Sequence, residues 1–554
     1  MPKSISRSTN DRFVFRKNAN IGAADAIQDE TFLFESFVDT GDIDTLKDTR
    51  NPKSIVVGRT GAGKTALLEY LRKNEERTVR IDVADLALSY ISNNTVIRFF
   101  SDLGVNLDLF YKLLWRHVLA VEVIRKHYKI IDEETNASVL RQIRERISKN
   151  RKTQEAFEYF TKYETSFWKE TDQRIKELTR RTEHELSNSA NIAAKAGVSK
   201  ANIEAGIETG NKELLTQEEK SAVYERGQEV INRVQMAELT RIIEMISEEL
   251  TDEQKKYYIT IDRLDEDWVD DGLRYKLIRA LIETVRDFNS RIRNLKIILA
   301  LREDLIERVF RYTRDSGQQE EKYQSMNLHV KWDKDYLVEL LDKRVNQLIR
   351  EQYTKQDINL RSILPIRVTK KEEDPIDYMI NRTMMRPRDA IMFFNECIEA
   401  AQGKPTINKQ RFLDAEASYS QKRLNALRDE WSTDYPNLIK FCLCLKKFPN
   451  TFRIREVKDK FEENILDFLT STDSDIRRDG YLYRMSEEKY NRGDVIGIID
   501  EGLRVFYKVG VVGVKAETYL STSWSYLGQK VLSTNDESTF HIHPMFWRVL
   551  GIEP

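Results

Sequence analysis

One octapeptide constrains this chain more than any other feature. The stretch "GRTGAGKT" (Gly58–Thr65) matches the pattern G-x-x-x-x-G-K-[ST] in full. It follows a short apolar strand, Ser54–Val57, and precedes a helical pattern carried by Leu67, Leu68 and Leu71. Glycines let a backbone wrap a phosphate with several N–H groups turned inward, and the helix N-terminus adds its positive dipole. We therefore expect an α/β core with a phosphate loop, the name used below for Gly58–Thr65.

The residues of the phosphate loop have different expected roles. Lys64 is predicted to reach the β- and γ-phosphates of a nucleotide, and the Thr65 hydroxyl to coordinate Mg²⁺. The other predicted cofactor-binding residues of this segment are Gly58, Arg59, Thr60, Gly61, Ala62, Gly63 and Ala66.

A second metal ligand is predicted in "YITIDRLDEDW" (Tyr258–Trp268). Asp262 ends an apolar, β-branched strand, so its carboxylate lies at the carboxyl edge, where ligands of open α/β sheets bind. Many P-loop ATPases place a water-polarising acid directly after the metal-binding Asp. Here that position is Arg263, which stays protonated and cannot act as a base. Either the base is displaced to Asp265 or Glu266, or hydrolysis is slow and the protein works as a switch.

Three arginines are predicted to meet the nucleotide. Arg302 ends a second buried strand, "KIILAL", where it could touch the γ-phosphate and report its presence. Arg386 and Arg388 flank Pro387 at the start of a helix, from which they could close over the nucleotide as part of a lid. The alternative for all three is an ordinary charge at a helix start. No NKxD guanine signature occurs, since "NKQR" (Asn408–Arg411) lacks the aspartate, so ATP is the expected nucleotide.

Composition excludes several other classes of protein. Lys and Arg number 90 and Asp and Glu 91, so nothing in the overall charge favours nucleic acid or an anionic membrane. The first residues lack the apolar core of a signal peptide, and no apolar run is long enough to span a membrane. Three cysteines in 554 residues form neither a disulfide framework nor a zinc pattern. A cytoplasmic location is expected.

The pattern along the chain predicts five regions. Residues 1–107 hold an N-terminal segment and the first part of the core, and residues 108–250 form an inserted helical arm. Residues 251–330 complete the core, 331–406 form a helical lid, and 407–554 form a C-terminal domain. Within the arm, Arg141–Lys152 is strongly basic, and the Gly/Ala-rich stretch Ser189–Gly210 suggests a hairpin or a mobile loop.

Several motifs together resemble a known group of proteins. The phosphate loop, "YYITIDRLDEDW", "KIILALRED", "MMRPRDAIMFFNE" and the terminal "FHIHPMFWRVLGI" resemble bacterial P-loop ATPases related to the STAND and KAP groups, in the AAA+-like branch. The resemblance implies a parallel core sheet with a central P-loop strand, a helical lid and a C-terminal winged-helix-like domain. It also implies a regulatory ATPase, often in antiviral defence or stress settings. Relatives commonly read Asp-Asp where this chain has Asp262-Arg263, which puts the hydrolytic step in question.

Three hypotheses on function follow from these patterns. The first is a regulatory ATPase that binds Mg²⁺-ATP to switch conformation or assembly, with a homo-oligomer or an effector protein as partner. The second is an ATP-driven nucleic-acid motor or loader that uses Arg141–Lys152 and the C-terminal domain. The third is a nucleotide-binding scaffold that hardly hydrolyses, as Arg263 suggests. No membrane partner is expected.

Overall fold

The computed structural model describes residues 13–128 except 85 and 87, 200–209, 212–236, and 250–553 except 314–320, 353–357, 369–372, 530–533 and 536, with isolated positions between 176 and 248. By their contacts these residues form two compact units. The core unit comprises Gly41–Gly58 and Lys64–Val330. The C-terminal unit comprises Met1–Thr40, Arg59–Gly63 and Lys331–Pro554. The basic stretch 141–152 lies outside the described residues.

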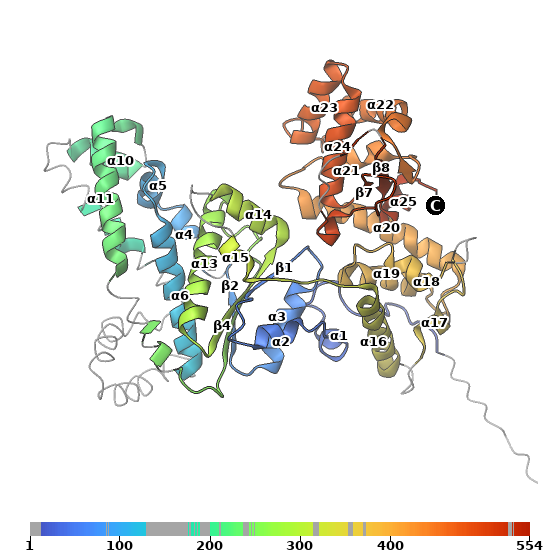
Figure 1. Cartoon of the computed structure of the whole chain (residues 1–554), viewed down its shortest axis with the longest axis horizontal. Coiled ribbons are helices and arrows are strands. Elements are labelled where there is room, and N and C mark those ends of the chain that lie inside the picture. Colours follow the sequence, from blue (N-terminus) through green and yellow to red (C-terminus); the bar gives the residue numbers. More distant parts are fainter. Residues whose placement is uncertain are drawn as a thin grey trace, which may run out of the picture. The chain divides into compact units, whose positions relative to one another are not determined.

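A five-stranded sheet organises the core unit (Figure 1). The strand order is β2-β3-β4-β1-β5, and all neighbouring pairs are parallel. The strands are β1 (Ile55–Gly58), β2 (Thr78–Asp82), β3 (Tyr257–Asp262), β4 (Leu295–Arg302) and β5 (Asn327–His329). β3 and β4 are buried up to their last residues, as expected when both faces of a parallel sheet are covered. The predicted α/β core is confirmed; the P-loop strand β1 is interior, although the middle strand is β4.

Helices surround this sheet and extend away from it in the arm. The described helices of the core unit are α2 (Asp42–Lys47), α3 (Lys64–Asn74), α4 (Ser89–Ser92), α5 (Thr95–Asp102), α6 (Asp108–Tyr128), α10 (Lys200–Thr209), η1 (Lys212–Leu214), α11 (Gln217–Met236), α13 (Asp271–Arg291), α14 (Glu303–Tyr312) and α15 (Glu321–Gln324). Asp270 caps the start of α13, because its side chain accepts a hydrogen bond from the Leu273 N–H at 3.1 Å. The indole of Trp115 on α6 donates to the Leu277 carbonyl of α13 at 2.9 Å, which fastens the arm's first helix to the core.

The C-terminal unit is mainly helical. Its helices are α1 (Glu30–Glu35), α16 (Lys334–Gln352), α17 (Leu360–Ile363), α18 (Pro375–Ile380), α19 (Pro387–Ala400), α20 (Lys409–Trp431), α21 (Leu438–Cys442), η2 (Leu443–Leu445), α22 (Ile454–Thr470), α23 (Tyr481–Asn491), α24 (Val495–Val509), η3 (Ser525–Leu527), η4 (Pro544–Phe546) and α25 (Trp547–Leu550). The N-terminal segment belongs to this unit through a buried ion pair between Asp29 and Arg344 of α16, at 2.5 Å.

A small antiparallel sheet lies near the end of the chain. Its strands are β6 (Thr451–Phe452), β7 (Val512–Lys515) and β8 (Thr539–Ile542), in the order β6-β8-β7. Along the chain α21 precedes β6, the helices α22, α23 and α24 follow it, and β7 and β8 come after these helices. The aromatic rings of Phe452 and Phe540 stack across β6 and β8, with centroids 5.8 Å apart.

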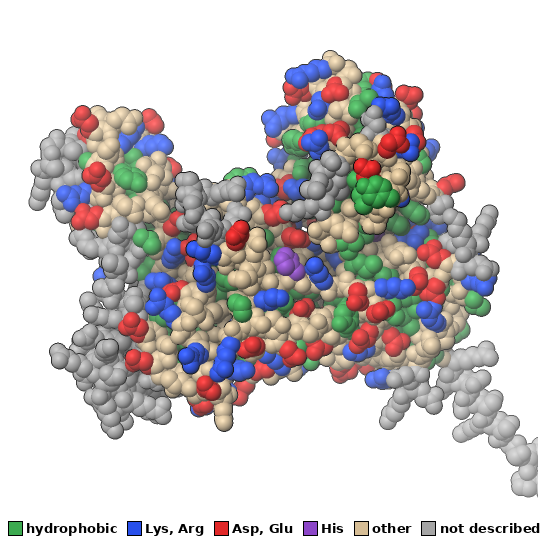
Figure 2. Space-filling model, viewed as in Figure 1, with side chains coloured by type: hydrophobic (Ala, Val, Ile, Leu, Met, Phe, Trp, Pro, Cys, Tyr) green, Lys and Arg blue, Asp and Glu red, His purple; other side chains and the backbone are tan. Residues whose placement is uncertain are grey.

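The surface is charged but mixed in sign. On the face shown in Figure 2, Lys and Arg side chains alternate with Asp and Glu over both units. Within the described residues, no helix is both long enough and apolar enough to cross a membrane.

Candidate functional site

The phosphate loop has the backbone that its glycines predict. It leaves β1 at Gly58, and α3 begins at Lys64. Gly61 and Gly63 have φ angles of +79° and +94°, a region that other residues rarely adopt. A Cβ at Gly61 would also lie 2.9 Å from the Cβ of Arg388. Both glycines are therefore required by the backbone conformation.

Thr65 and Asp262 are brought together at the carboxyl edge of the sheet. The Thr65 hydroxyl donates to Oδ2 of Asp262 at 2.7 Å, and Oδ1 of Asp262 accepts the N–H of Arg263 at 2.8 Å. A hydroxyl and a carboxylate are ligands that Mg²⁺ accepts, and Mg²⁺ usually keeps waters and substrate phosphates as its remaining ligands. The two predicted metal ligands thus fit a nucleotide-bound Mg²⁺.

Lys64 is held beside this pair. Its ammonium donates to the Gly58 carbonyl at 3.0 Å. Burial lowers the pKa of Lys64 to about 8, although the nearby carboxylates of Asp262 and Asp265 act in the opposite direction. The amine is thus charged at neutral pH and loses its proton well below the range of an exposed lysine.

This pKa predicts a pH dependence of nucleotide binding. A phosphate is attracted by the charged amine, and the terminal phosphate of a nucleotide is already ionised above pH 8. We expect ATP affinity to fall about tenfold per pH unit between pH 8 and pH 10, because binding must then restore the proton on Lys64. Calorimetry across this range measures the slope. Lys64→Arg, whose guanidinium keeps its proton, should remove it; an equal slope in both proteins would contradict the assignment.

The acidic turn after β3 is fixed by residues that the sequence did not reveal. Buried Arg274 of α13 donates to the carbonyl of Glu266 and to the carboxylate of Asp267, both at 2.9 Å, and also contacts Asp271. The indole of Trp268 donates to the Leu264 carbonyl at 3.2 Å. A turn held at this many points presents its acids in a defined geometry.

Arg263 adopts a backbone conformation that is unusual for its type. Its φ is +58°, which costs an L-residue about 1 kcal/mol or more. Its guanidinium lies 3.5 Å from Glu266 Oε1. Burial raises the pKa of Glu266, and the charge of Arg263 opposes that shift. Arg263 therefore serves as an ion-pair partner of one of the two candidate bases.

The other candidate base, Asp265, is paired with Arg302. The distance between Arg302 Nη1 and Asp265 Oδ2 is 3.5 Å. Arg302 also forms two hydrogen bonds with Asp304, at 2.9 and 3.1 Å, and Asp304 accepts a third from Arg308 at 2.6 Å. The register of the sheet places Arg302 directly beside Gly58, at the start of the phosphate loop.

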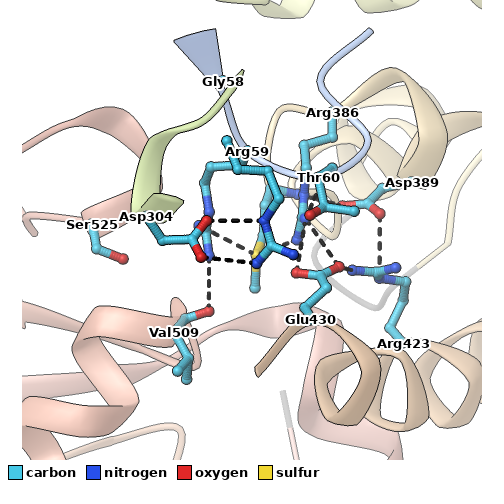
Figure 3. A network of polar contacts seen from close by, with 12 residues as sticks. Gly58, Arg59, Thr60, Asp304, Arg386, Asp389, Arg423, Glu430, Val509 and Ser525 are labelled. Carbon is cyan, nitrogen blue, oxygen red and sulfur yellow. Dashed lines mark hydrogen bonds and ion pairs between the residues drawn. The ribbon is translucent and has the colours of Figure 1, made fainter. Parts of the chain in front are cut away.

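The tip of the phosphate loop has partners in the C-terminal unit (Figure 3). Arg386 donates to the Thr60 carbonyl at 2.8 Å, and it also contacts Asp389 and Glu430. The N–H of Arg388 lies 3.4 Å from the Gly61 carbonyl, and its side chain donates to the Ala24 carbonyl at 3.1 Å. Both predicted lid arginines thus contact the loop or its neighbours, Arg386 through a side chain that is almost fully buried.

These features define the class of fold. A phosphate loop after β1, an acid at the end of β3, an arginine at the end of β4 and the order β2-β3-β4-β1-β5 are those of a P-loop nucleoside-triphosphatase fold.

Comparison with known proteins gives a partial family match and one curated relative. Residues 335–428, which run from α16 into α20, match the FunZ-associated C-terminal helical domain. The "Putative transposon gamma-delta 80.3 kDa protein" of Escherichia coli K12 is 23% identical over 574 residues, covering 97% of this chain and 67% of that protein.

Two solved structures resemble the chain distantly. The Walker-type ATPase PABY2304 of Pyrococcus abyssi is 13% identical with a TM-score of 0.37, covering 93% of this chain and 95% of its own. The ORC2 protein of Aeropyrum pernix, in ADPNP and ADP complexes, is 10% identical with a TM-score of 0.34, covering 93% of each chain. TM-scores this low carry no argument, and the P-loop fold class rests on the strand order and the phosphate loop.

Proposed function

We propose that the chain is a regulatory ATPase that binds Mg²⁺-ATP at the phosphate loop and switches its conformation or assembly with the nucleotide state. The observation that carries the proposal is the hydrogen bond between Thr65 and Asp262 at 2.7 Å, beside the partly buried side chain of Lys64. In this proposal Lys64 binds the β- and γ-phosphates, and Thr65 and Asp262 hold the metal. The loop backbone from Gly58 to Ala66 cradles the phosphates.

The switch requires contacts that differ between the ATP and ADP states. Arg302 supplies one, because it must exchange its two hydrogen bonds with Asp304 for a γ-phosphate. The lid arginines Arg386 and Arg388 supply others, through their contacts with the loop tip. A homo-oligomer or an effector protein is the proposed partner, and the resemblance to STAND and KAP proteins favours a defence or stress setting.

Hydrolysis in this proposal uses a displaced base. Arg263 takes the place of the usual acid, which leaves Asp265 and Glu266. Asp265 forms an ion pair with Arg302. Glu266 has a raised pKa, which suits a group that must accept a proton. Glu266 is therefore the preferred base. The rival reading, a scaffold with little hydrolysis, is favoured by the ion pair between Arg263 and Glu266.

A nucleic-acid motor is the second candidate function. The order α21-β6-α22-α23-α24-β7-β8 and the strand arrangement β6-β8-β7 support a winged-helix-like domain, and the name of the E. coli relative refers to a transposon. Against it, exposed Arg504 on α24 is paired with Asp500 at 2.8 Å and lies 4.0 Å from Glu501. A helix face with balanced charge gives little attraction for phosphates.

A phosphate-release assay with and without DNA or RNA separates these candidates. We expect Mg²⁺-dependent release from ATP by the wild-type protein, at a rate that nucleic acid leaves unchanged. The Lys64→Ala variant should show only background release. Stimulation by DNA would favour the motor, and background release by the wild-type protein in every condition would favour the scaffold.

A further inference from the structure

The tip of the phosphate loop is unusually well anchored. Four consecutive residues, Arg59 to Ala62, belong to the C-terminal unit, and each makes a contact with another residue of that unit. Three of these contacts engage carbonyls: Arg386 binds that of Thr60 at 2.8 Å, the Arg388 N–H that of Gly61 at 3.4 Å, and the Trp332 indole that of Ala62 at 2.9 Å. The fourth is the side chain of Arg59. Because these contacts engage the carbonyl groups of the loop, we expect its N–H groups to donate hydrogen bonds to a phosphate.

The side chain of Arg59 reaches the end of α24. Its Nη2 donates to the carbonyl of Val509, the last residue of that helix, at 3.0 Å. Terminal carbonyls have no partner within their own helix, and a cation there also interacts favourably with the helix dipole. Gly510 follows with a φ of +85°, and a Cβ on it would lie 3.1 Å from Nη1 of Arg59. The helix end is thus shaped to admit this guanidinium.

Arg386 connects the loop to a buried network of four charges (Figure 3). It lies 3.1 Å from Asp389 and 3.2 Å from Glu430, while Arg423 lies 3.2 Å from Asp389 and 3.0 Å from Glu430. The four side chains are between 0% and 8% exposed. Asp389 is on α19, and Arg423 and Glu430 are on α20. Two cations balance two anions, and removing one would leave a buried charge unpaired, which is strongly destabilising.

We propose that Arg59 and Arg386 are positioning residues that couple the phosphate loop to α24 and to the α19–α20 pair, so that nucleotide binding alters the C-terminal end of α24. The inference rests on the proposed nucleotide site and adds the route by which the rest of the chain senses it. The backbone of the loop is restrained at both ends and at its tip. Its ends continue into β1 and α3, and its tip is hydrogen-bonded to α19 and α24. A phosphate that draws the loop N–H groups inward therefore displaces carbonyls that Arg386, Arg388 and Trp332 hold.

Coupling of this kind is reciprocal. A ligand that shifts the end of α24 must change ATP affinity by the same factor by which ATP changes the affinity for that ligand. A partner bound to the domain formed by β6, α22, α24, β7 and β8 would then regulate nucleotide binding without touching the nucleotide.

Hydrogen–deuterium exchange tests the proposal on the full-length chain. Amide exchange is followed in the loop (58–65) and at the end of α24 (505–511), for the protein alone, with Mg²⁺-ADP and with a non-hydrolysable Mg²⁺-ATP analogue. We expect protection of the loop with either nucleotide, together with a change of about fivefold at 505–511 that differs between ADP and the analogue. Protection of the loop with no change at 505–511 would overturn the coupling alone. No protection of the loop would overturn the nucleotide site and the coupling with it.

Variants separate coupling from binding. Arg59→Ala removes the side-chain contact to Val509 and keeps the backbone of the loop, so the loop should still be protected by the analogue while the change at 505–511 is lost. Arg59→Lys keeps the charge and should retain part of the change. Arg504→Ala, on the same helix but paired with Asp500, is the matched control and should behave as wild type. An unaltered response in a folded Arg59→Ala protein would overturn the role of Arg59.

Discussion

Replacing Lys64 with alanine should lower ATP affinity about 100-fold. Hydrogen bonds to charged groups contribute about 1.5–3 kcal/mol each, and Lys64 is proposed to bind two phosphates. The substitution should leave the fold intact, because Lys64 begins α3 and alanine is a strong helix former. Isothermal titration calorimetry measures the affinity, and thermal unfolding confirms that the variant is folded.

Lys53→Ala is the matched control for this experiment. Lys53 is exposed and precedes β1. The substitution therefore removes one positive charge, as Lys64→Ala does, but from a position before the strand and outside the loop. It should bind ATP as the wild-type protein does. Equal ATP affinities for Lys64→Ala and the wild type would refute the phosphate-loop assignment. The loop has one other charged residue, Arg59, and the side chain of Arg59 contacts α24.

Replacing Asp262 with asparagine should reduce Mg²⁺-dependent turnover about 100- to 1,000-fold. The amide has the size of the carboxylate and still offers an oxygen to Thr65, but it lacks the negative charge that anchors the metal. Steady-state phosphate release over a range of Mg²⁺ concentrations measures the effect. Asp252→Asn, an exposed position five residues before β3, should keep wild-type turnover. A modest loss shared by both variants would mean that Asp262 is not a metal ligand.

The same assay ranks the two candidate bases. The Glu266→Gln variant should lose most of the wild-type turnover while keeping ATP affinity, because a raised pKa suits Glu266 to accept a proton. Asp265→Asn should have the smaller effect, through loss of its ion pair with Arg302. Wild-type rates in both variants would exclude a displaced base in this turn.

The local parts of the fold and site were predictable because short segments determine them. The phosphate loop needs positive φ at Gly61 and Gly63, and the sequence supplies glycine at both. A run of β-branched residues ending in Asp262 predicts a buried strand with an acid at its carboxyl end, and β3 has this form. In each case the cause lies within a few residues of the effect.

Features that depend on distant contacts could not be predicted. Arg274 looks like one more charge on a helix, yet it is buried and fixes the acidic turn. Arg386 was predicted to close over the nucleotide, and that role stays a prediction; the sequence did not reveal that its side chain holds the Thr60 carbonyl, Asp389 and Glu430 in a buried network on two helices. The stretch Ser189–Gly210, of which the structure describes Lys200–Thr209, was expected to form a hairpin or a mobile loop because it is rich in small residues and lacks an apolar stripe. The described part is helix α10, so for Lys200–Thr209 the expectation was wrong.

The order of the strands also determines when the core can assemble during synthesis. β1 pairs with β4 and β5, so the strand that ends at Gly58 finds its first partner only after the ribosome has added Arg302. At about 5–20 residues per second this interval is roughly 10–50 s. Throughout that time an apolar strand with both edges unpaired leads into the phosphate loop, and such edges promote aggregation. The nascent chain of this protein should therefore depend on a chaperone, or on rapid translation of the arm, more than its final charged surface suggests.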